Sequence, residues 1–417
     1  MKSYIIEGGR KINGTVEISG SKNASLPILA ATILGNGNSK LYNVPEISDI
    51  DNTLKILEKI GCKIKRNNGR IEINSQYINS TDIPRELMSK MRSSVILAGA
   101  LVGRYGNAKF SYPGGCDIGS RPIDIHMNAF KKLGIEIREE QGNIICSTEK
   151  VVGSTINLDF PSVGATENII LATCMAQGTT IINNAAMEPE IVDLITFLRK
   201  MGANIEGEGT NRIIVNGVKK LSGTSYNVMP DRIEAGTFLC LAAATGGEVL
   251  LKNTNYGNME AIINKLEESG CIIECQKNTI HLCAPKRLKS LEIKTTVYPG
   301  FPTDMQQIFS AMLLKASGTS VIVENIFENR FKYISELRKM GTKIIQDGRI
   351  AIITGKRKIQ SAEMICTDLR GGAAIVIAAL TAKGNSKIRN IEYILRGYEN
   401  FEKKLNNIGA KIKVIND

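Results

Sequence analysis

Apolar segments of two kinds alternate along the 417-residue chain. Segments of the first kind mix apolar residues at helical spacing with polar ones, reach a glycine, and continue as alternating apolar and polar residues. This pattern predicts an amphipathic surface helix, a glycine that closes it in the left-handed conformation, and then a strand. Six copies occur, at residues 57–64, 130–137, 198–205, 266–273, 337–344 and 405–412.

Segments of the second kind are apolar nearly all round and rich in small residues, so they predict buried helices. Each is followed by a glycine, which we expect to mark the end of the helix. Short β-type segments such as 179–182 and 320–323 come next. The six buried helices are expected at 26–34, 95–102, 169–176, 238–244, 308–314 and 374–380, before Gly35, Gly103, Gly178, Gly246, Gly318 and Gly384.

The two patterns together define six repeats, because the closing glycines of the surface helices lie 73, 68, 68, 71 and 68 residues apart. Each repeat holds one buried helix, one surface helix and several short strands. Six such units exceed a single hydrophobic core, so we predict an α/β (α+β) protein of two domains with three repeats each.

The composition narrows the class of protein. With 43% hydrophobic and 23% charged residues, the chain is neither disordered nor fibrous. Its longest apolar runs, such as 373–382, fall short of the ~18 residues that a membrane helix needs. The first ten residues carry no apolar signal-peptide core. We therefore expect a cytoplasmic protein without membrane insertion.

The net charge of +12 favours anionic partners, which are nucleic acid, acidic lipid or phosphorylated metabolites. The chain has only two histidines and nine cysteines, and it lacks a C-x-x-C pair. These counts argue against a His-rich metal site, a His-centred catalytic triad and structural disulfides. We expect no metal and no organic cofactor.

A polar cluster precedes each predicted buried helix. Ser, Thr, Asp and Asn at such positions are ordinary N-caps. Lys22, Arg92 and Arg370 need another explanation, because a cation at a helix N-terminus opposes the helix dipole unless an anion binds there. If the buried helices run parallel, these ends meet on one surface of each domain. We therefore predict an anion-binding cleft between the two domains.

A glycine-rich loop carries a candidate reactive cysteine. Residues 112–126 hold three glycines and two prolines, with Cys116 directly after Gly-Gly and with Arg121 and His126 nearby. Neighbouring cations lower the pKa of a thiol, so Cys116 is a candidate acid or nucleophile. The alternative is an inert core thiol.

These strings together resemble the family of enolpyruvyl transferases that act on UDP-N-acetylglucosamine. The likeness runs end to end and in order. It rests on Gly20-Ser-Lys-Asn23, Pro113-Gly-Gly-Cys116, Arg121-Pro-Ile-Asp-Ile125, Ser162-Val-Gly-Ala-Thr166, Asn184 to Glu190, Pro230 to Glu234, Phe301 to Gln306, Ile326 to Arg330, Thr367 to Arg370, and Leu395-Arg396-Gly-Tyr398.

The resemblance implies the fold and the reaction. The fold is a two-domain inside-out α/β barrel of six βαβαββ-type repeats, with domain I at residues 1–20 plus 231–417 and domain II at 21–230. The active site is expected in the interdomain cleft. The reaction moves the enolpyruvyl group of phosphoenolpyruvate to the 3′-hydroxyl of UDP-N-acetylglucosamine and releases phosphate, which starts peptidoglycan precursor synthesis.

The resemblance also implies residue roles. Cys116 protonates C3 of the enol and can form a covalent adduct, so we expect fosfomycin to inactivate it. Asp304 is the base near the sugar hydroxyl, and Lys22, Arg121 and Arg396 hold phosphoenolpyruvate. Asp368 and Arg370 couple domain closure to the site. The positions that match contacts to UDP-N-acetylglucosamine are Asn23, Arg92, Arg121, Pro122, Ile123, Asp124, Ile125, Ser162, Val163, Gly164, Asp304 and Ile326.

One position departs from the family pattern. Many members carry a lysine just before the Ser-Val-Gly string, where this chain has Phe160-Pro161. The resemblance therefore carries over no uridine-side contact to that position.

Two other readings compete with this one. The shikimate-pathway enolpyruvyl transferases share the architecture and phosphoenolpyruvate, but they lack the Pro-Gly-Gly-Cys loop. A basic scaffold that binds nucleic acid would use the +12 charge, yet the basic residues are spread along the chain and aromatics are only 5%, which speaks against nucleic-acid stacking. The sequence does not specify an oligomeric state.

Overall fold

A computed structural model describes residues 2–67, 69–112, 114 and 123–416, with only the backbone of Arg92. The described residues form two compact units. Unit 1 holds residues 2–19 and 230–416, and unit 2 holds those between 20 and 229. The domain boundaries predicted from the sequence lie one residue later at each crossing. Each unit has its own hydrophobic core.

The core of unit 1 is built from helices that are buried on nearly every side. The helix α8 (Arg232–Thr245), α10 (Gln306–Met312) and α12 (Leu369–Thr381) pack against one another, and every described residue of α12 is buried. The short 3-10 helices η4 (Thr303–Met305) and η5 (Leu313–Lys315) extend α10 at its two ends.

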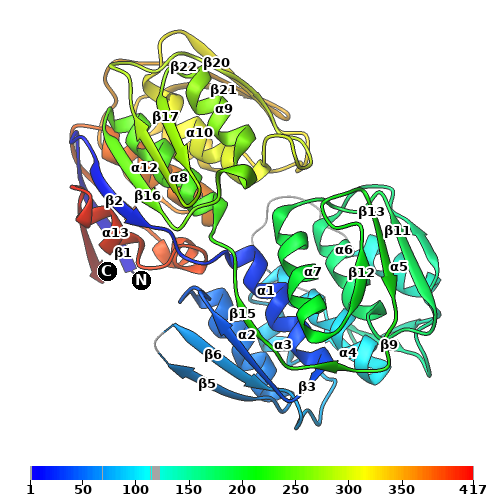
Figure 1. Ribbon diagram of the computed structural model, residues 1–417. Coiled ribbons are helices and arrows are strands. Elements are labelled where there is room, and N and C mark those ends of the chain that lie inside the picture. The colour runs from blue at the N-terminus through cyan, green and yellow to red at the C-terminus, as the bar shows by residue number, and fades with distance from the viewer. Residues whose placement is uncertain (1, 68, 113, 115–122, 417) are drawn as a thin grey trace. The chain divides into compact units, whose positions relative to one another are not determined.

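Amphipathic helices and sheets surround this helical core (Figure 1). The outer helices are α9 (Glu260–Glu268), α11 (Tyr333–Arg338) and α13 (Phe401–Asn407), with the 3-10 helices η3 (Tyr256–Asn258) and η6 (Ile391–Arg396). One sheet has the order β23 (Glu363–Ile365), β24 (Gly384–Arg389), β1 (Lys2–Gly8) and β25 (Lys411–Asn416). The next has the order β17 (Ile272–Gln276), β18 (Thr279–Cys283), β16 (Glu248–Lys252) and β2 (Asn13–Glu17). The last has the order β19 (Glu292–Lys294), β20 (Thr319–Val323), β22 (Ile350–Thr354) and β21 (Lys343–Asp347).

Unit 2 repeats this plan. Its buried helices are α1 (Lys22–Ala31), α4 (Ile96–Tyr105) and α6 (Val163–Thr173), and η1 (Thr32–Leu34) and η2 (Arg92–Val95) adjoin the first two. The helices α2 (Ser48–Lys59), α5 (Asp124–Lys132) and α7 (Pro189–Met201) carry polar outer faces, and α3 (Arg85–Met88) is a single turn.

The sheets of unit 2 lie outside these helices (Figure 1). Their orders are β10 (Thr155–Asn157), β11 (Thr179–Asn183), β13 (Arg212–Asn216), β12 (Asn204–Glu206); then β15 (Ser225–Asn227), β4 (Asn38–Tyr42), β6 (Arg70–Asn74), β5 (Lys63–Asn67); and β7 (Asn107–Ser111), β9 (Asn143–Ser147), β8 (Glu136–Glu140). A short pair joins β14 (Leu221–Ser222) to β3 (Gly35–Asn36).

The pairing within one sheet explains the βαβαββ repeat. The strand β19 runs parallel to β20, and the buried α10 connects them, as a parallel pair requires. The surface helix α11 then leads to the antiparallel hairpin of β21 and β22, and β22 pairs with β20. Helices therefore lie inside and sheets outside in each unit, which confirms the predicted inside-out α/β barrel.

Glycines close the surface helices as the sequence predicted. All six adopt positive φ, from 72° to 111°, at Gly61, Gly134, Gly202, Gly270, Gly341 and Gly409. A residue with a side chain would be strained there. At Gly202 an added Cβ would meet no atom within 4 Å, so the requirement comes from the backbone alone.

Two predicted ends of buried helices are wrong, and the first is that of α6, which ends at Thr173 instead of the expected Ala176. The second is the end that the sequence placed before Gly103, because α4 continues to Tyr105 and closes at Gly106, where φ is 69°. Gly103 instead faces α6, where an added Cβ would lie 2.7 Å from the carbonyl oxygen of Leu171. Gly99, one turn earlier, is just as close to Asn168. These glycines let α4 and α6 pack closely. The sequence pattern alone cannot distinguish a glycine with this packing role from a glycine that ends a helix.

Among the helices of the described residues, none combines the length and the apolar character that a membrane crossing requires.

Candidate active site

Acidic and hydroxyl side chains cap four of the six buried helices, α1, α6, α8 and α12, as the sequence predicted. Among the described residues, the starts of α4 and α10 have no side-chain cap, so the prediction is wrong for these two. Asp231 accepts hydrogen bonds from the backbone N–H groups of Ile233 and Glu234 at 2.8 and 3.0 Å. Asp368 accepts from those of Arg370 and Gly371 at 3.1 and 2.8 Å. These caps satisfy N–H groups that a helix otherwise leaves without a partner.

Ser21 and Ser162 cap α1 and α6 in the same way in unit 2, each through one backbone N–H at 3.3 Å. The cap geometry therefore accounts for the serine at the start of each helix.

In unit 1, Asp304 lies between two arginines. Arg330 Nη2 is 2.5 Å from Asp304 Oδ1, and Arg370 approaches Asp304 Oδ2 through Nε and Nη2, each at 3.2 Å. The two arginine side chains are 6% and 3% exposed, whereas that of Asp304 is 27% exposed. Two buried cations stabilise the charged form of the carboxylate. Asp304 is thus an anion that solvent or a ligand can reach.

A buried carboxylate next to this group holds the surrounding loop. Glu324 is fully buried and accepts hydrogen bonds from the hydroxyls of Thr295 and Thr303 at 3.0 and 2.7 Å. It also accepts from the backbone N–H groups of Ile326 and Phe327 at 2.9 and 3.1 Å. Thr303 in turn accepts from Arg330 Nη1 at 2.6 Å. The backbone at Ile326 and the guanidinium of Arg330 are therefore positioned by one network.

Arg370 is the most enclosed cation of the group. Its guanidinium lies 5.2 Å from the ring centre of Tyr398, whose hydroxyl is 2.9 Å from that of Thr237 on α8. Burial lowers the pKa of Arg370, but the charges of Tyr398, Asp304 and Asp231 outweigh it and hold that pKa above its ordinary value. Arg370 Nη1 is buried and has no hydrogen-bond partner within the described part of the chain. Arg396, at the end of η6, lies two residues before Tyr398 and is partly exposed.

In unit 2, Lys22 lies in the first turn of α1 and faces an acidic partner. Its Nζ is 3.2 Å from Asp49 Oδ2, and the two side chains are 14% and 2% exposed. Lys22 and Arg370 therefore each face a carboxylate of the chain, on α2 and η4 respectively. Asn23, next to Lys22, is partly exposed.

The starts of α5 and α6 lie together. Ile123 caps α5, and Asp124 and Ile125 form its first turn. His126 Nδ1 is 2.9 Å from the amide nitrogen of Asn168 on α6. An added Cβ at Gly164 would come within 3.2 Å of the His126 ring, so Ser162, Val163 and Gly164 lie beside the residues that follow the cysteine loop.

A buried carboxyl group on α6 was not expected to be a site residue. Burial, and then the charges of Glu190 and Glu188, raise the pKa of Glu167 well above its ordinary value. The sequence showed these glutamates only as parts of longer strings, because nothing in a single chain marks a carboxyl group as buried.

Several predicted residues lie outside the described residues. These are Cys116, Arg121 and Pro122, and the side chain of Arg92.

Three of the residues predicted for unit 1 thus come together, because Asp304 contacts Arg370 and Asp368 caps α12, the helix that carries Arg370. Arg330 stands in the sequence only as part of a longer string, and no sequence pattern indicates its role. It precedes a surface helix, whereas the cations predicted to bind an anion stand at the starts of buried helices. The one signal in the sequence was the string Ile326 to Arg330, and the structure places Arg330 against Asp304.

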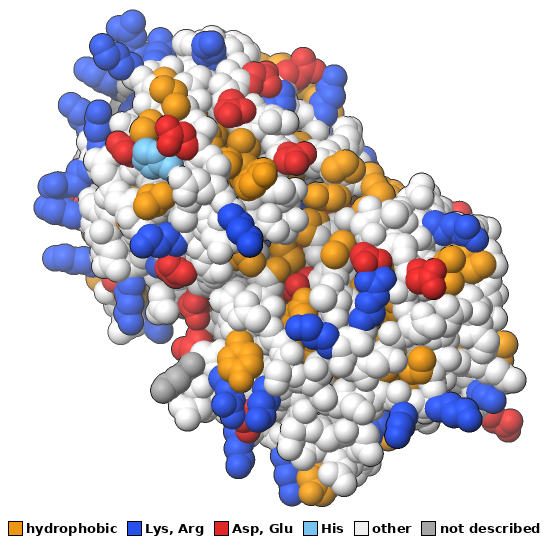
Figure 2. Space-filling view, viewed as in Figure 1, with side chains coloured by type: hydrophobic (Ala, Val, Ile, Leu, Met, Phe, Trp, Pro, Cys, Tyr) orange, Lys and Arg blue, Asp and Glu red, His pale blue; other side chains and the backbone are white. Residues whose placement is uncertain are grey.

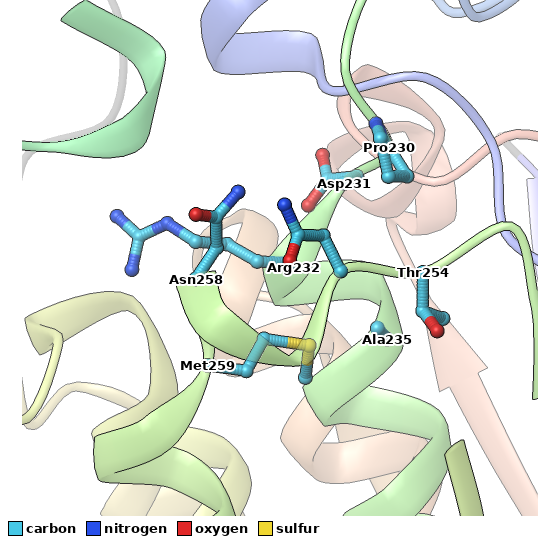
Figure 3. A pocket seen from close by; sticks show the side chains of 8 residues that line it. Pro230, Asp231, Arg232, Ala235, Thr254, Asn258 and Met259 are labelled. Atoms are coloured by element: carbon cyan, nitrogen blue, oxygen red, sulfur yellow. The ribbon is translucent and has the colours of Figure 1, made fainter. Parts of the chain in front are cut away.

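A small pocket in unit 1 lies near the start of α8. Figure 3 shows the polar side chains of Asp231, Arg232 and Asn258 above the apolar Ala235 and Met259. Its empty space of about 170 Å³ includes open solvent, so the hollow itself is far smaller than the roughly 300–1,000 Å³ of typical ligand pockets. None of the predicted substrate-binding residues lines it, so this pocket does not mark the substrate site.

The comparisons with known proteins identify the class. Residues 6–405 match the family described as EPSP synthase (3-phosphoshikimate 1-carboxyvinyltransferase), and the chain belongs to this enolpyruvyl transferase family. The fold agrees, since the enolpyruvyl transferase NikO from Streptomyces tendae superposes with a TM-score of 0.90 at 21% identity, over 99% of both chains.

Within the family, the similar curated relatives carry a more specific name. The chain is 49% identical to UDP-N-acetylglucosamine 1-carboxyvinyltransferase 2 of Caldanaerobacter subterraneus subsp. tengcongensis, over 99% of both sequences. It is 47% identical to the protein of the same name from Carboxydothermus hydrogenoformans, over the full length of both.

Proposed function

We propose that this protein transfers the enolpyruvyl group of phosphoenolpyruvate to the 3′-hydroxyl of UDP-N-acetylglucosamine and releases phosphate. The observation that carries the proposal is the 49% identity, over 99% of both chains, to a protein named UDP-N-acetylglucosamine 1-carboxyvinyltransferase. The reaction takes place in the cytoplasm and is the first committed step of peptidoglycan precursor synthesis. It thereby serves cell-wall growth and cell division.

The reaction proceeds by addition and elimination. The sugar oxygen bonds to C2 of phosphoenolpyruvate while C3 gains a proton. The C2–O bond to phosphate then breaks, C3 loses a proton, and phosphate leaves. Such chemistry needs an acid at C3, a base at the hydroxyl and cations for the carboxylate and phosphate.

The residues divide these tasks. Cys116 supplies the proton to C3, and Asp304 is the base. The geometry of Asp304 supports its role, because two arginines hold its carboxylate in place and its 27% exposure leaves it accessible. Lys22, Arg121 and Arg396 bind phosphoenolpyruvate.

The contacts to the sugar nucleotide follow the family resemblance. We assign these contacts to Asn23, Arg92, Arg121, Pro122, Ile123, Asp124, Ile125, Ser162, Val163, Gly164 and Ile326, with Asp368 and Arg370 supporting the site. Phe160 is 41% exposed, so this position presents an apolar side chain where many family members have a lysine, and we assign it no contact.

The experiment measures phosphate released from phosphoenolpyruvate with either UDP-N-acetylglucosamine or shikimate 3-phosphate as acceptor. We expect release with the sugar nucleotide only, and its loss in Asp304→Asn. Asparagine keeps an oxygen for the buried arginines, so the variant retains more of the native contacts than alanine would. Release with shikimate 3-phosphate only would assign the protein to the function that names the family.

A second measurement tests Cys116. We expect fosfomycin, incubated with the protein and the sugar nucleotide, to add its mass to the intact chain, and Cys116→Ser to prevent the addition. An unmodified wild-type chain would contradict the role of this thiol.

A further inference from the structure

Three metal-ligating side chains lie together on the outer face of one sheet of unit 1. His281 and Cys283 are two residues apart on β18, so their side chains leave the same face. Glu248 on β16 pairs directly with Cys283. Leu282, which lies between His281 and Cys283 in the sequence, points into the core and is fully buried.

The distances among the three donor atoms suit a small cation. His281 Nε2 is 2.8 Å from Glu248 Oε1 and 3.9 Å from Cys283 Sγ, and all three atoms lie within 4.8 Å of one another. Zn²⁺ binds nitrogen and oxygen at about 2.0–2.2 Å and sulfur at about 2.3 Å, so a tetrahedral site separates its ligand atoms by about 3.3–3.6 Å. To reach that spacing, the distance from His281 to Glu248 must widen by about 0.5 Å or more, and the distance from His281 to Cys283 must shorten by about 0.3 Å or more. The distance from Glu248 to Cys283 must shorten by at most about 1.2 Å.

The residues around this cluster favour the binding of a cation, although the chain as a whole is basic. Glu274 on β17 pairs with His281 from the other side, which adds a second carboxylate to the cluster. Ile272 faces Cys283, and Leu250 faces His281. The cluster therefore combines acidic and apolar neighbours. Figure 2 shows a histidine at the surface with acidic side chains beside it.

The cluster is accessible from solvent. The side chains of His281 and Glu248 are 33% and 57% exposed. None of the three residues has a role in the proposed transfer reaction.

We propose that Glu248, His281 and Cys283 form a surface site for Zn²⁺, with water as the fourth ligand. The thiol of Cys283 gives its proton to solvent when the Zn–S bond forms, and neutral His281 coordinates through Nε2. A set of one sulfur, one nitrogen and one oxygen selects Zn²⁺ over Mg²⁺ or Ca²⁺, which prefer oxygen ligands. The ion would link β16 to β18 across the sheet.

The test titrates the metal-free full-length protein with Zn²⁺ in competition with a chromophoric chelator. We expect one equivalent to bind in the wild type, and its affinity to fall more than about tenfold in Cys283→Ser and in His281→Gln, since even the loss of an outer partner of a metal ligand costs that much. The matched control is Cys275→Ser, which removes an exposed thiol from the neighbouring strand β17 and should bind as the wild type does. Cys116 is present in all of these proteins and cancels in the comparison.

Co²⁺ provides an independent readout of the ligands. Its thiolate charge-transfer absorption should appear in the wild type and in Cys275→Ser, and disappear in Cys283→Ser. The variant Glu248→Gln should keep this absorption and bind more weakly. Equal Zn²⁺ affinity in wild type and Cys283→Ser, or a Co²⁺ spectrum without thiolate absorption in the wild type, would overturn the proposal.

Discussion

Replacing Arg330 by methionine removes one of the two guanidinium groups that hold Asp304. Methionine is nearly as long and as apolar as the aliphatic stem of arginine. The main change is therefore the loss of the contacts to Asp304 Oδ1 at 2.5 Å and to Thr303 at 2.6 Å. Arg370 remains on the other oxygen at 3.2 Å. Asp304 is therefore still charged but held on one side only.

The size of the effect follows from the hydrogen bond to the carboxylate. A hydrogen bond to a charged group contributes about 1.5–3 kcal/mol. If that contribution is lost when the base must be in position, kcat/KM falls by about 10- to 150-fold. Arg330 does not contact substrate in this scheme, so it is a positioning residue, and the fall should appear in kcat more than in KM.

The assay is steady-state phosphate release with both substrates varied. Arg349→Met is the matched control, because Arg349 makes an exposed ion pair with Glu328 at 3.5 Å and such pairs contribute little. We expect it to stay within about twofold of the wild type. Arg330→Lys should recover only part of the activity, since an ammonium group lacks the planar fork that reaches two acceptors.

A double-mutant cycle with Asp304→Asn decides the mechanism. If Arg330 acts through Asp304, adding Arg330→Met to Asp304→Asn should cost almost nothing further. Two effects that multiply in the double variant would refute the argument that Arg330 positions this carboxylate.

Three further predictions concern stability. Burial raises the pKa of Asp193 from 3.8 to about 6, so the folded chain binds this proton more tightly than the unfolded chain. The free energy of unfolding should therefore fall by up to about 3 kcal/mol as pH rises from about 4 to about 7. Denaturant unfolding of Asp193→Asn should lack this fall, and the same pH dependence in the variant and the wild type would contradict the prediction. Gly202→Ala should lower the free energy of unfolding by about 1–2 kcal/mol, because alanine is strained at a φ of 106°. The added methyl would meet no other atom, so the loss reports the backbone strain alone, and an unchanged melting curve would contradict it. Asn168→Ala should cost about 2–4 kcal/mol by chemical denaturation, since the side chain accepts from Gly99 N–H at 2.8 Å and donates to the Val95 carbonyl at 3.1 Å in the core; a loss below 1 kcal/mol would mean that water replaces these bonds.

The sequence predicted the helices well because their signals are local. The run from Leu198 to Gly202 contains the apolar spacing, the basic last turn and the glycine that close α7. Gly103 shows the limit of such signals. A glycine that ends a helix and a glycine that admits a neighbouring helix look the same until the neighbour, α6, is placed.

The candidate site was predictable only in part, because its contacts join distant segments. Asp304 and Arg370 are 66 residues apart, and only a resemblance to known enzymes connected them. Arg330 stood within a recognised string, but its burial against Asp304 depends on the packing of the loop that Glu324 holds. The register of β16 against β18, which brings Glu248 to Cys283, is likewise absent from any local pattern.

The way unit 1 is assembled has a consequence for synthesis on the ribosome. Strands β1 and β2 leave the ribosome first, yet β2 pairs with residues 235 positions later, and the partners of β1 on β24 lie 376 or more residues further on. All of unit 2 is made in between, and its first and last segments are joined by the hydrogen bond from Ser21 N–H to the Met229 carbonyl. Unit 2 can therefore close while translation continues, whereas the nascent N-terminal strands wait with unpaired edges. Any slowing of elongation late in the message prolongs that wait, so the yield of native protein should depend on translation speed and on chaperones that shield the waiting strands.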